Sequence, residues 1–131
     1  MIASGNEKDE VITLLLLLSR TTFTEEERML AEKACHALTR WKLFSDLAIR
    51  HGVAALVWQN ILDLGLAEAV PEQERNLLEN IRFNTIARVS YMTSEAAEAV
   101  TELDKEGIRV LLLKGLALEH SVYGSRGLRQ I

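Results

Sequence analysis

A chain of 131 residues has the length of one domain and can bury a substantial hydrophobic core. Its composition, 48% hydrophobic and 26% charged, is that of a soluble globular protein and excludes a disordered chain. The net charge of −4 argues against a general electrostatic attraction to nucleic acid, so no nucleic-acid partner is expected.

The single cysteine and the first apolar run bear on the cellular compartment. Cys35 has no second cysteine with which to form an internal disulfide, and this suits a reducing cytoplasm. The apolar run over residues 11–18 is shorter than the ~20 residues that span a bilayer. Acidic residues precede it, unlike the basic region of a signal peptide. We therefore expect a cytoplasmic protein with no membrane partner, whose first helix covers about residues 8–20.

Leucine, alanine, glutamate and arginine dominate the chain, and this composition predicts a mainly α-helical fold. Thr24 followed by Glu27 fits a capping box, which marks the start of a helix. We expect this helix to carry Met29, Leu30, Ala34 and Leu38.

The next two helices are predicted over residues 41–50 and 53–64. Each is followed by a glycine, Gly52 or Gly65, the residue that most readily accepts a left-handed helix end.

Pro71 suits the first position of a long helix over residues 71–106, with a possible bend near residues 93–94. Apolar positions step along it by three or four residues, and we expect this stripe to belong to the core. The stripe consists of Leu78, Ile81, Thr85, Val89, Met92, Ala96, Val100 and Leu103.

After Gly107 the pattern changes. The short apolar run over residues 108–113 predicts a buried strand, and residues 116–122 return to helical spacing. A loop over residues 124–127 follows, and residues 128–131 begin a second extended segment. The chain thus divides into a helical region over residues 1–106 and a different unit over residues 107–131.

The turn at Lys114-Gly115 is the best candidate for a functional site. A glycine between a strand and a helix lets the backbone approach a ligand, and the amides at the start of the helix favour a phosphate. Lys114 adds a positive charge, and Arg126 and Arg129 could steer a triphosphate or an acceptor. The alternatives are an ordinary turn and two arginines on a solvated surface. Residues 105–131 carry five cationic and two anionic side chains, which suits an anionic ligand.

The residues from Gly107 to Leu118 read GIRVLLLKGLAL, and Tyr123-Gly124 and Gly127-Leu128-Arg129 follow them. This pattern resembles the uncharacterised nucleotidyltransferase family of the polymerase-beta-like superfamily. The resemblance covers roughly residues 40–131 and is most specific at the Lys114-Gly115 segment. It implies an incomplete α/β core, entered through its first strand, turn and helix. It also implies transfer of a nucleotidyl group from a nucleoside triphosphate to an acceptor, with phosphate contacts at the Lys114-Gly115 turn. Arg126 and Arg129 are the weaker candidates for such contacts.

In that family an acidic strand of the form Asp-x-Asp follows and holds Mg²⁺ in a two-metal mechanism. Its acids would fall beyond Ile131, so no catalytic or metal-binding residue is assigned in this chain. The histidines share no metal-ligand spacing with one another or with Cys35. Mg²⁺ is therefore expected for the complete enzyme and no cofactor for this chain, which we expect to be inactive.

Two hypotheses follow. The chain is the truncated N-terminal part of a nucleotidyltransferase, in which case the strand over residues 108–113 should lack its neighbours and expose apolar side chains. Alternatively it is a non-catalytic helical interaction module derived from such an enzyme. That module should have a closed core, or should self-associate through the incomplete sheet.

Overall fold

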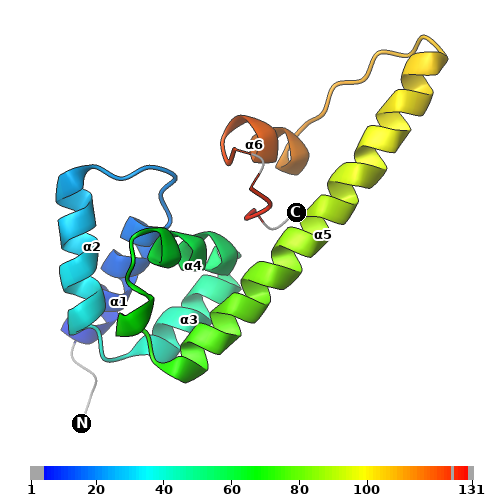
Figure 1. The fold of residues 1–131 in the computed structure, drawn as a ribbon. Coiled ribbons are helices and arrows are strands. Elements are labelled where there is room, and N and C mark those ends of the chain that lie inside the picture. The colour runs from blue at the N-terminus through cyan, green and yellow to red at the C-terminus, as the bar shows by residue number, and fades with distance from the viewer. Residues whose placement is uncertain (1–4, 125, 130–131) are drawn as a thin grey trace.

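The computed structural model describes residues 5–124 and 126–129, and it is mainly α-helical as predicted. Figure 1 shows several short helices gathered at one end of a single long helix. Among the described residues no β-strand is formed. The elements are α1 (Gly5–Leu18), α2 (Glu25–Ala37), α3 (Trp41–Arg50), α4 (Ala54–Asp63), the 3₁₀ turn η1 (Ala67–Ala69), α5 (Glu72–Lys105) and α6 (Gly115–Ser121).

The hydrophobic core lies where α1, α3 and α4 pack against one another and against the first half of α5. Helix α4 is buried over most of its length. Trp41 and Phe44 of α3 meet edge to face, with ring centroids 5.1 Å apart. Burying an apolar side chain of this size stabilises the fold by about 1.5–3 kcal/mol. The other fully buried core side chains include Val11, Leu14, Leu18, Val57, Ile61 and Leu78.

The helix ends follow the sequence signals. The Thr24 side chain accepts a hydrogen bond from the Glu27 amide at 3.1 Å, and the Glu27 side chain accepts one from the Thr24 amide. Gly52 and Gly65 end α3 and α4 with φ values of 70° and 71°, as predicted. Pro71 lies one position earlier than expected, because α5 begins at Glu72.

Asn60 ties the end of α1 to α4. Its buried Nδ2 donates hydrogen bonds to the carbonyl oxygens of Leu18 at 2.8 Å and Arg20 at 2.7 Å. These carbonyls lie at and beyond the last turn of α1, where no helical amide can reach them. The asparagine therefore fixes the direction in which the chain leaves α1.

The large apolar residues Met29 and Leu30 of α2 do not lie on the face that packs against the core. These two side chains are 64% and 53% exposed, whereas Ala31 and Cys35 are buried. Helix α2 packs chiefly against α1, and small residues on its inner face allow a close approach. Burial raises the pKa of the Cys35 thiol to about 12, so this thiol stays protonated.

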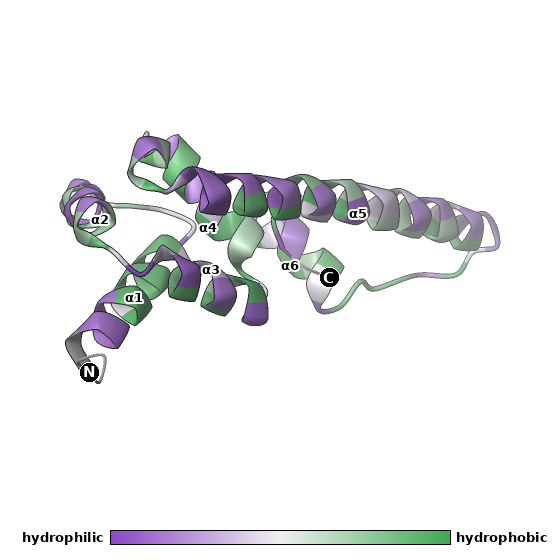
Figure 2. Ribbon diagram, turned by 90° about the horizontal axis from the view of Figure 1, so that it is seen from below, coloured by the Kyte–Doolittle hydropathy of each residue, from purple (hydrophilic) through white to green (hydrophobic). Residues whose placement is uncertain are grey.

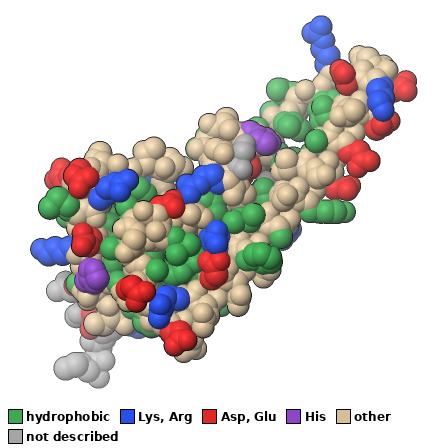
Figure 3. Space-filling model, in the orientation of Figure 1, with side chains coloured by type: hydrophobic (Ala, Val, Ile, Leu, Met, Phe, Trp, Pro, Cys, Tyr) green, Lys and Arg blue, Asp and Glu red, His purple; other side chains and the backbone are tan. Residues whose placement is uncertain are grey.

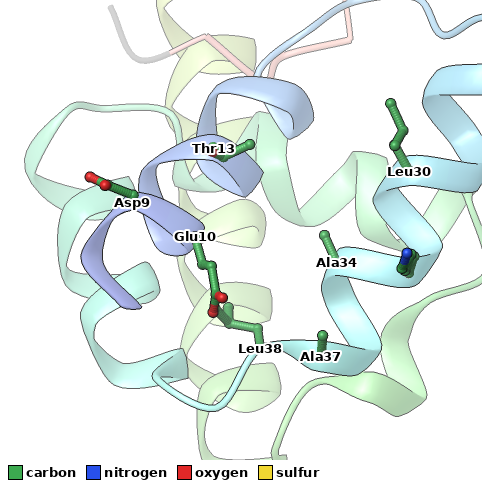
Figure 4. A pocket seen from close by; sticks show the side chains of 8 residues that line it. Asp9, Glu10, Thr13, Leu30, Ala34, Ala37 and Leu38 are labelled. Carbon is green, nitrogen blue, oxygen red and sulfur yellow. The ribbon is translucent and has the colours of Figure 1, made fainter. Parts of the chain in front are cut away.

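A groove with a cavity volume of ≈ 440 Å³ lies between α1 and α2. Figure 4 shows the side chains of Asp9, Glu10 and Thr13 on α1, opposite those of Leu30, Ala34, Ala37 and Leu38 along α2 and its end. The groove is lined by residues outside the region that contains the predicted phosphate contacts.

Only the first half of α5 belongs to the core, which corrects the prediction for its apolar stripe. Leu78 and Val89 are buried, whereas positions from Met92 onward are at best half-buried and Leu103 is 38% exposed. Helices α3 and α4 contact α5 near its beginning, and its outer half extends past them without a bend (Figure 1).

The strand predicted over residues 108–113 is not formed. The segment runs back beside the outer half of α5 without a partner strand, and residues 109–113 make no backbone–backbone hydrogen bond to another described residue (Figures 1 and 2). A strand is defined by hydrogen bonds to a neighbour, and the described residues supply no neighbour. The second predicted extended segment falls partly on residues 130–131, which lie outside the described residues, as does Ser125 of the predicted loop.

Among the described residues, no helix is both long enough and apolar enough to cross a membrane.

Candidate functional site

The turn that begins α6 has an unusual backbone. Lys114 adopts φ 61° and ψ −128°, a conformation that costs a residue with a Cβ atom of order 1–3 kcal/mol. The Lys114 carbonyl accepts a hydrogen bond from the Leu118 amide at 2.9 Å, which starts the helix. No side chain forms a capping hydrogen bond at this end of α6, where the first backbone amides have no partner within the helix. The Lys114 side chain is exposed beside them.

Beyond α6 the chain folds back on itself through the Gly127 loop, which comprises the described residues 123, 124 and 126–129. Gly127 has φ 71°, and its amide donates a hydrogen bond to Oε1 of the buried Glu119 on α6. A Cβ atom at this position would lie 3.3 Å from Cα of Ile86 on α5, so a glycine is needed here for space as well as for conformation. The loop is thereby held between α5 and α6.

Leu128 anchors the same loop to the helices. It is 2% exposed and packs with Ala55 and Leu56 of α4, with Ile86 and Tyr123 at the edge of the cluster. This small cluster is separate from the main core, and it fixes the two arginines on either side of Leu128.

Arg126 is held by an ion pair. Its guanidinium donates a hydrogen bond to Asp63 Oδ2 of α4 at 2.8 Å. Burial is the largest single influence on the pKa of Asp63 and raises it. The hydrogen bonds from Arg126 and Gln59, with the positive charges of Arg126 and Arg82, together lower that pKa below its ordinary value.

This pair continues a polar network along α4 and α5. Gln59 Nε2 donates to Asp63 Oδ1 at 2.9 Å, and Arg82 donates to Gln59 Oε1 at 3.0 Å. Arg82 also donates two hydrogen bonds to Glu79, at 3.0 and 2.6 Å, and Trp58 Nε1 donates a third at 2.6 Å. The network connects the position of the Gly127 loop to the packing of α4 on α5.

Arg129 faces a cavity of ≈ 320 Å³. The cavity lies between the end of α3, the start of α4 and the loop, and is lined by His51, Gly52, Val53, Leu56, Tyr123, Leu128 and Arg129. The Arg129 guanidinium carbon lies 6.0 Å from the centre of the Tyr123 ring. One guanidinium nitrogen, Nη1, is buried without a hydrogen-bond partner. A buried cationic donor in this state favours an anionic ligand.

A comparison with protein-family profiles matches residues 38–131 to a family described as an uncharacterised nucleotidyltransferase. The chain belongs to this family. The match takes in α3 to α6 and the Gly127 loop, and it omits both α1 and α2. Searches of curated proteins and of solved structures found no match.

The structure does not bring the four predicted phosphate contacts of this nucleotidyltransferase chain into one site. Lys114 and Gly115 lie at the start of α6, and Arg126 and Arg129 lie beyond its end. Arg126 is engaged by Asp63, whereas Arg129 faces a cavity with an unpaired donor. The phosphate-binding role of all four residues stays a prediction.

Two residues near the Gly127 loop were not singled out from the sequence as site residues. Glu119 is 1% exposed and bonds the loop, although glutamates in short helices usually face solvent. Tyr123 packs beside Arg129, and only its position within the family pattern draws attention to it. A glutamate followed eight residues later by a glycine is too weak a signal to predict this contact.

The nucleotidyltransferase superfamily uses Mg²⁺, a cation that proteins bind through carboxylate oxygens. Over residues 5–124 and 126–129, no three histidine, cysteine or acidic side chains come together in a way that could hold a metal ion. Asp104 and Glu106, which flank the end of α5, are exposed. The described residues therefore do not fit a Mg²⁺ site.

Proposed function

We propose that this chain carries the nucleotide-binding N-terminal part of a nucleotidyltransferase and binds a nucleoside triphosphate. The observation that carries the proposal is the family match over residues 38–131, because it includes both the Lys114-Gly115 turn and the Gly127 loop. The strained backbone at Lys114 adds support, since strain of this kind collects at ligand-binding turns. In the complete enzyme the nucleotidyl group would pass to an acceptor with the help of Mg²⁺.

Arg129 is the strongest phosphate contact in this proposal. Its Nη1 is buried and has no hydrogen-bond partner, so an anionic oxygen would satisfy it without breaking an existing hydrogen bond. Arg126 is weaker, because it must exchange Asp63 for the ligand. Lys114 and the open amides at Gly115 would contact a different part of the nucleotide, since α6 separates them from the arginines.

The segment over residues 108–113 is, in this proposal, the first strand of the α/β core and takes strand form when a neighbouring strand pairs with it. Its exposure alternates as in a strand: Val110 and Leu112 are 42% and 40% exposed, whereas Leu111 and Leu113 are 79% and 70% exposed. One face already turns toward α5, and the other is open. This alternation supports the proposal that residues 108–113 can form a β-strand when a neighbouring strand pairs with them.

Binding of nucleoside triphosphates to the purified chain tests the proposal. A fluorescent triphosphate should bind saturably, and Arg129→Ala should weaken binding by about 10- to 100-fold, because a charge-assisted hydrogen bond is lost. Lys114→Ala should weaken binding less, because this side chain is exposed. Arg88→Ala and Lys42→Ala remove equal charge from exposed positions elsewhere and should leave binding unchanged. Absence of saturable binding, or equal effects of all four variants, would contradict the proposal.

We further propose that the chain alone binds nucleotide without transferring it, because the described residues offer no donor set for Mg²⁺. The test is an assay for release of pyrophosphate from each of the four nucleoside triphosphates with Mg²⁺ present. Measurable turnover by the pure chain, lost in Arg129→Ala, would overturn this part while leaving nucleotide binding intact.

A second candidate function is a non-catalytic interaction module that self-associates. The exposed apolar side chains over residues 108–113 favour it, since patches of this kind often mark protein contacts (Figure 3). Light scattering after size-exclusion chromatography separates the two functions. A stable dimer without triphosphate binding would support the module, and a monomer that binds triphosphate would support the nucleotidyltransferase.

A further inference from the structure

A second cavity lies on the other side of the Gly127 loop from Arg129. We call it the Glu119 pocket; its volume is ≈ 260 Å³, and it lies between α5, α6 and the loop. Ile86, Val89, Ser90 and Thr93 line it from α5, and Glu119 and Gly127 line the opposite side. His120 and Arg126 complete the rim. The volume suits a small molecule and excludes a folded partner.

The central group of this pocket is the Glu119 carboxylate. The residue is 1% exposed, and its Oε1 accepts a hydrogen bond from the Gly127 amide. Its Oε2 is buried and has no hydrogen-bond donor in the structure. A buried acceptor of this kind is costly to leave unpaired, and a carboxylate is more costly than a neutral group. Glu119 lines the pocket, so this unsatisfied acceptor belongs to a side chain in the pocket wall.

The neighbouring groups indicate the chemistry that would satisfy Glu119. Ser90 and Thr93 add hydroxyl groups on the α5 side, and these can donate or accept. The positive charge of Arg126 opposes a cationic ligand, but Asp63 holds that guanidinium at 2.8 Å and offsets its charge. Glu119 itself makes no ion pair with another described residue.

We propose that the Glu119 pocket binds a small protonated amine that also carries hydroxyl groups. The ammonium group donates a hydrogen bond to Glu119 Oε2, and the hydroxyl groups bond to Ser90 and Thr93. Ile86 and Val89 provide the apolar wall that excludes bulk water from the ion pair. Arg129, the stronger of the proposed phosphate contacts, lines a separate cavity, and the Glu119 pocket shares only the weaker contact, Arg126.

A pair of nearly isosteric probes tests the charge requirement. Tris(hydroxymethyl)aminomethane is an ammonium compound with three hydroxyl groups at pH 7, and pentaerythritol replaces its ammonium group with a fourth CH₂OH. Each is titrated into the ¹⁵N-labelled 131-residue chain in a buffer without amines, and amide resonances are followed by NMR. The Gly127 amide is the reporter, because it bonds to the other oxygen of the same carboxylate. The amine should shift it saturably, and pentaerythritol should bind at least tenfold more weakly.

Three variants assign the binding to the pocket. Glu119→Gln should weaken binding of the amine at least tenfold. Glu98→Gln makes the same change at an exposed position of α5 and should leave binding of the amine unchanged. Ser90→Leu fills the pocket from an exposed position and should abolish binding with Glu119 intact, so the test survives if Glu119→Gln fails to fold.

Three outcomes would overturn the proposal. The first is no saturable shift with the amine, which would mean that the pocket holds solvent only. The second is equal affinity for pentaerythritol, which would mean that charge is not recognised. The third is unchanged binding in Ser90→Leu, which would place the amine elsewhere on the chain.

Discussion

The two ends of α5 have similar apolar patterns and opposite surroundings. At the first end, Leu78 is fully buried beneath α4 and the other short helices. At the other end, Leu103 is 38% exposed, and acidic side chains follow one edge of the helix (Figure 3). The comparison shows that an amphipathic stripe does not by itself determine burial. The stripe is buried only where another element packs against it.

The largest expected effect contrasts two phenylalanines. Phe44 is 0% exposed in the core, and Phe83 is 68% exposed on α5. Phe44→Ala should lower the free energy of unfolding by about 3–5 kcal/mol, because it removes buried apolar area and leaves a cavity. Phe83→Ala should change it by less than about 0.5 kcal/mol. Urea denaturation followed by circular dichroism measures both, and comparable losses in the two variants would show that the outer surface of α5 is covered in solution.

The next effect concerns the Gly127 loop. Gly127→Ala should cost about 1–3 kcal/mol locally, because the new Cβ meets Ile86 and the backbone has φ 71°. Gly124→Ala introduces strain at φ 66° with only a 3.9 Å contact to Arg126, so it isolates the steric part. In Gly127→Ala, amide hydrogen exchange should become faster in the Gly127 loop and in α6, and it should stay unchanged in α4. Equal effects of the two variants would mean that the contact with Ile86 is unimportant.

A smaller effect should appear at low pH. Hydrogen bonds from Arg82, aided by Trp58, hold the pKa of Glu79 below its ordinary value of 4.5, and partial burial opposes them. A carboxyl group with a lowered pKa in the folded state stabilises the fold above its unfolded pKa, and this stability is lost as the pH falls through the folded pKa. The melting temperature should therefore fall from about pH 5 downward.

The matched variant for this pH effect is Glu79→Gln. It should melt at a lower temperature than the parent chain at pH 7 and lose less on acidification, because it has no carboxyl group to titrate. Thermal unfolding at several pH values between 7 and 3 measures this. Parallel curves for the two proteins would contradict a contribution from the network of Trp58, Glu79 and Arg82.

The smallest effect on stability should come from the exposed segment. Leu111→Asn with Leu113→Asn should change the free energy of unfolding by less than about 0.5 kcal/mol, because these side chains are 79% and 70% exposed. If the segment mediates self-association, the same double variant should weaken it in sedimentation experiments. Leu16→Asn with Met29→Asn makes the same change at exposed positions of α1 and α2 and should leave association unchanged.

Local signals in the sequence predicted the helices well. The bounds of α3 agree with the prediction, and the capping box at Thr24 and the stops at Gly52 and Gly65 are all present. Each of these features depends on a few neighbouring residues. The sequence did not indicate which face of α2 is buried, because that face depends on the position of α1, a separate element; Met29 is exposed, and Ala31 and Cys35 are buried.

The candidate site depended more on distant contacts. Residue pattern and charge pointed to the Lys114-Gly115 turn and the arginines, the family resemblance strengthened the turn, and the profile match over residues 38–131 confirms that family. The pairing of Arg126 with Asp63 joins residues far apart in the sequence, and the contact of Glu119 with the Gly127 amide crosses from α6 to a loop. Pattern and spacing carry no information on such contacts, so they became visible only in the folded chain.

The length of α5 has a mechanical consequence. Its 34 residues form a rod of about 51 Å, attached to the helical bundle at one end. A tilt of about 10° where α4 holds it would displace the far end by about 9 Å. The ion pair of Arg126 with Asp63 and the packing of Leu128 hold the Gly127 loop between α4 and Ile86, which lies part of the way along α5. A ligand that weakens either contact would therefore move the far end of α5 much further than it moves the residues in the contact itself.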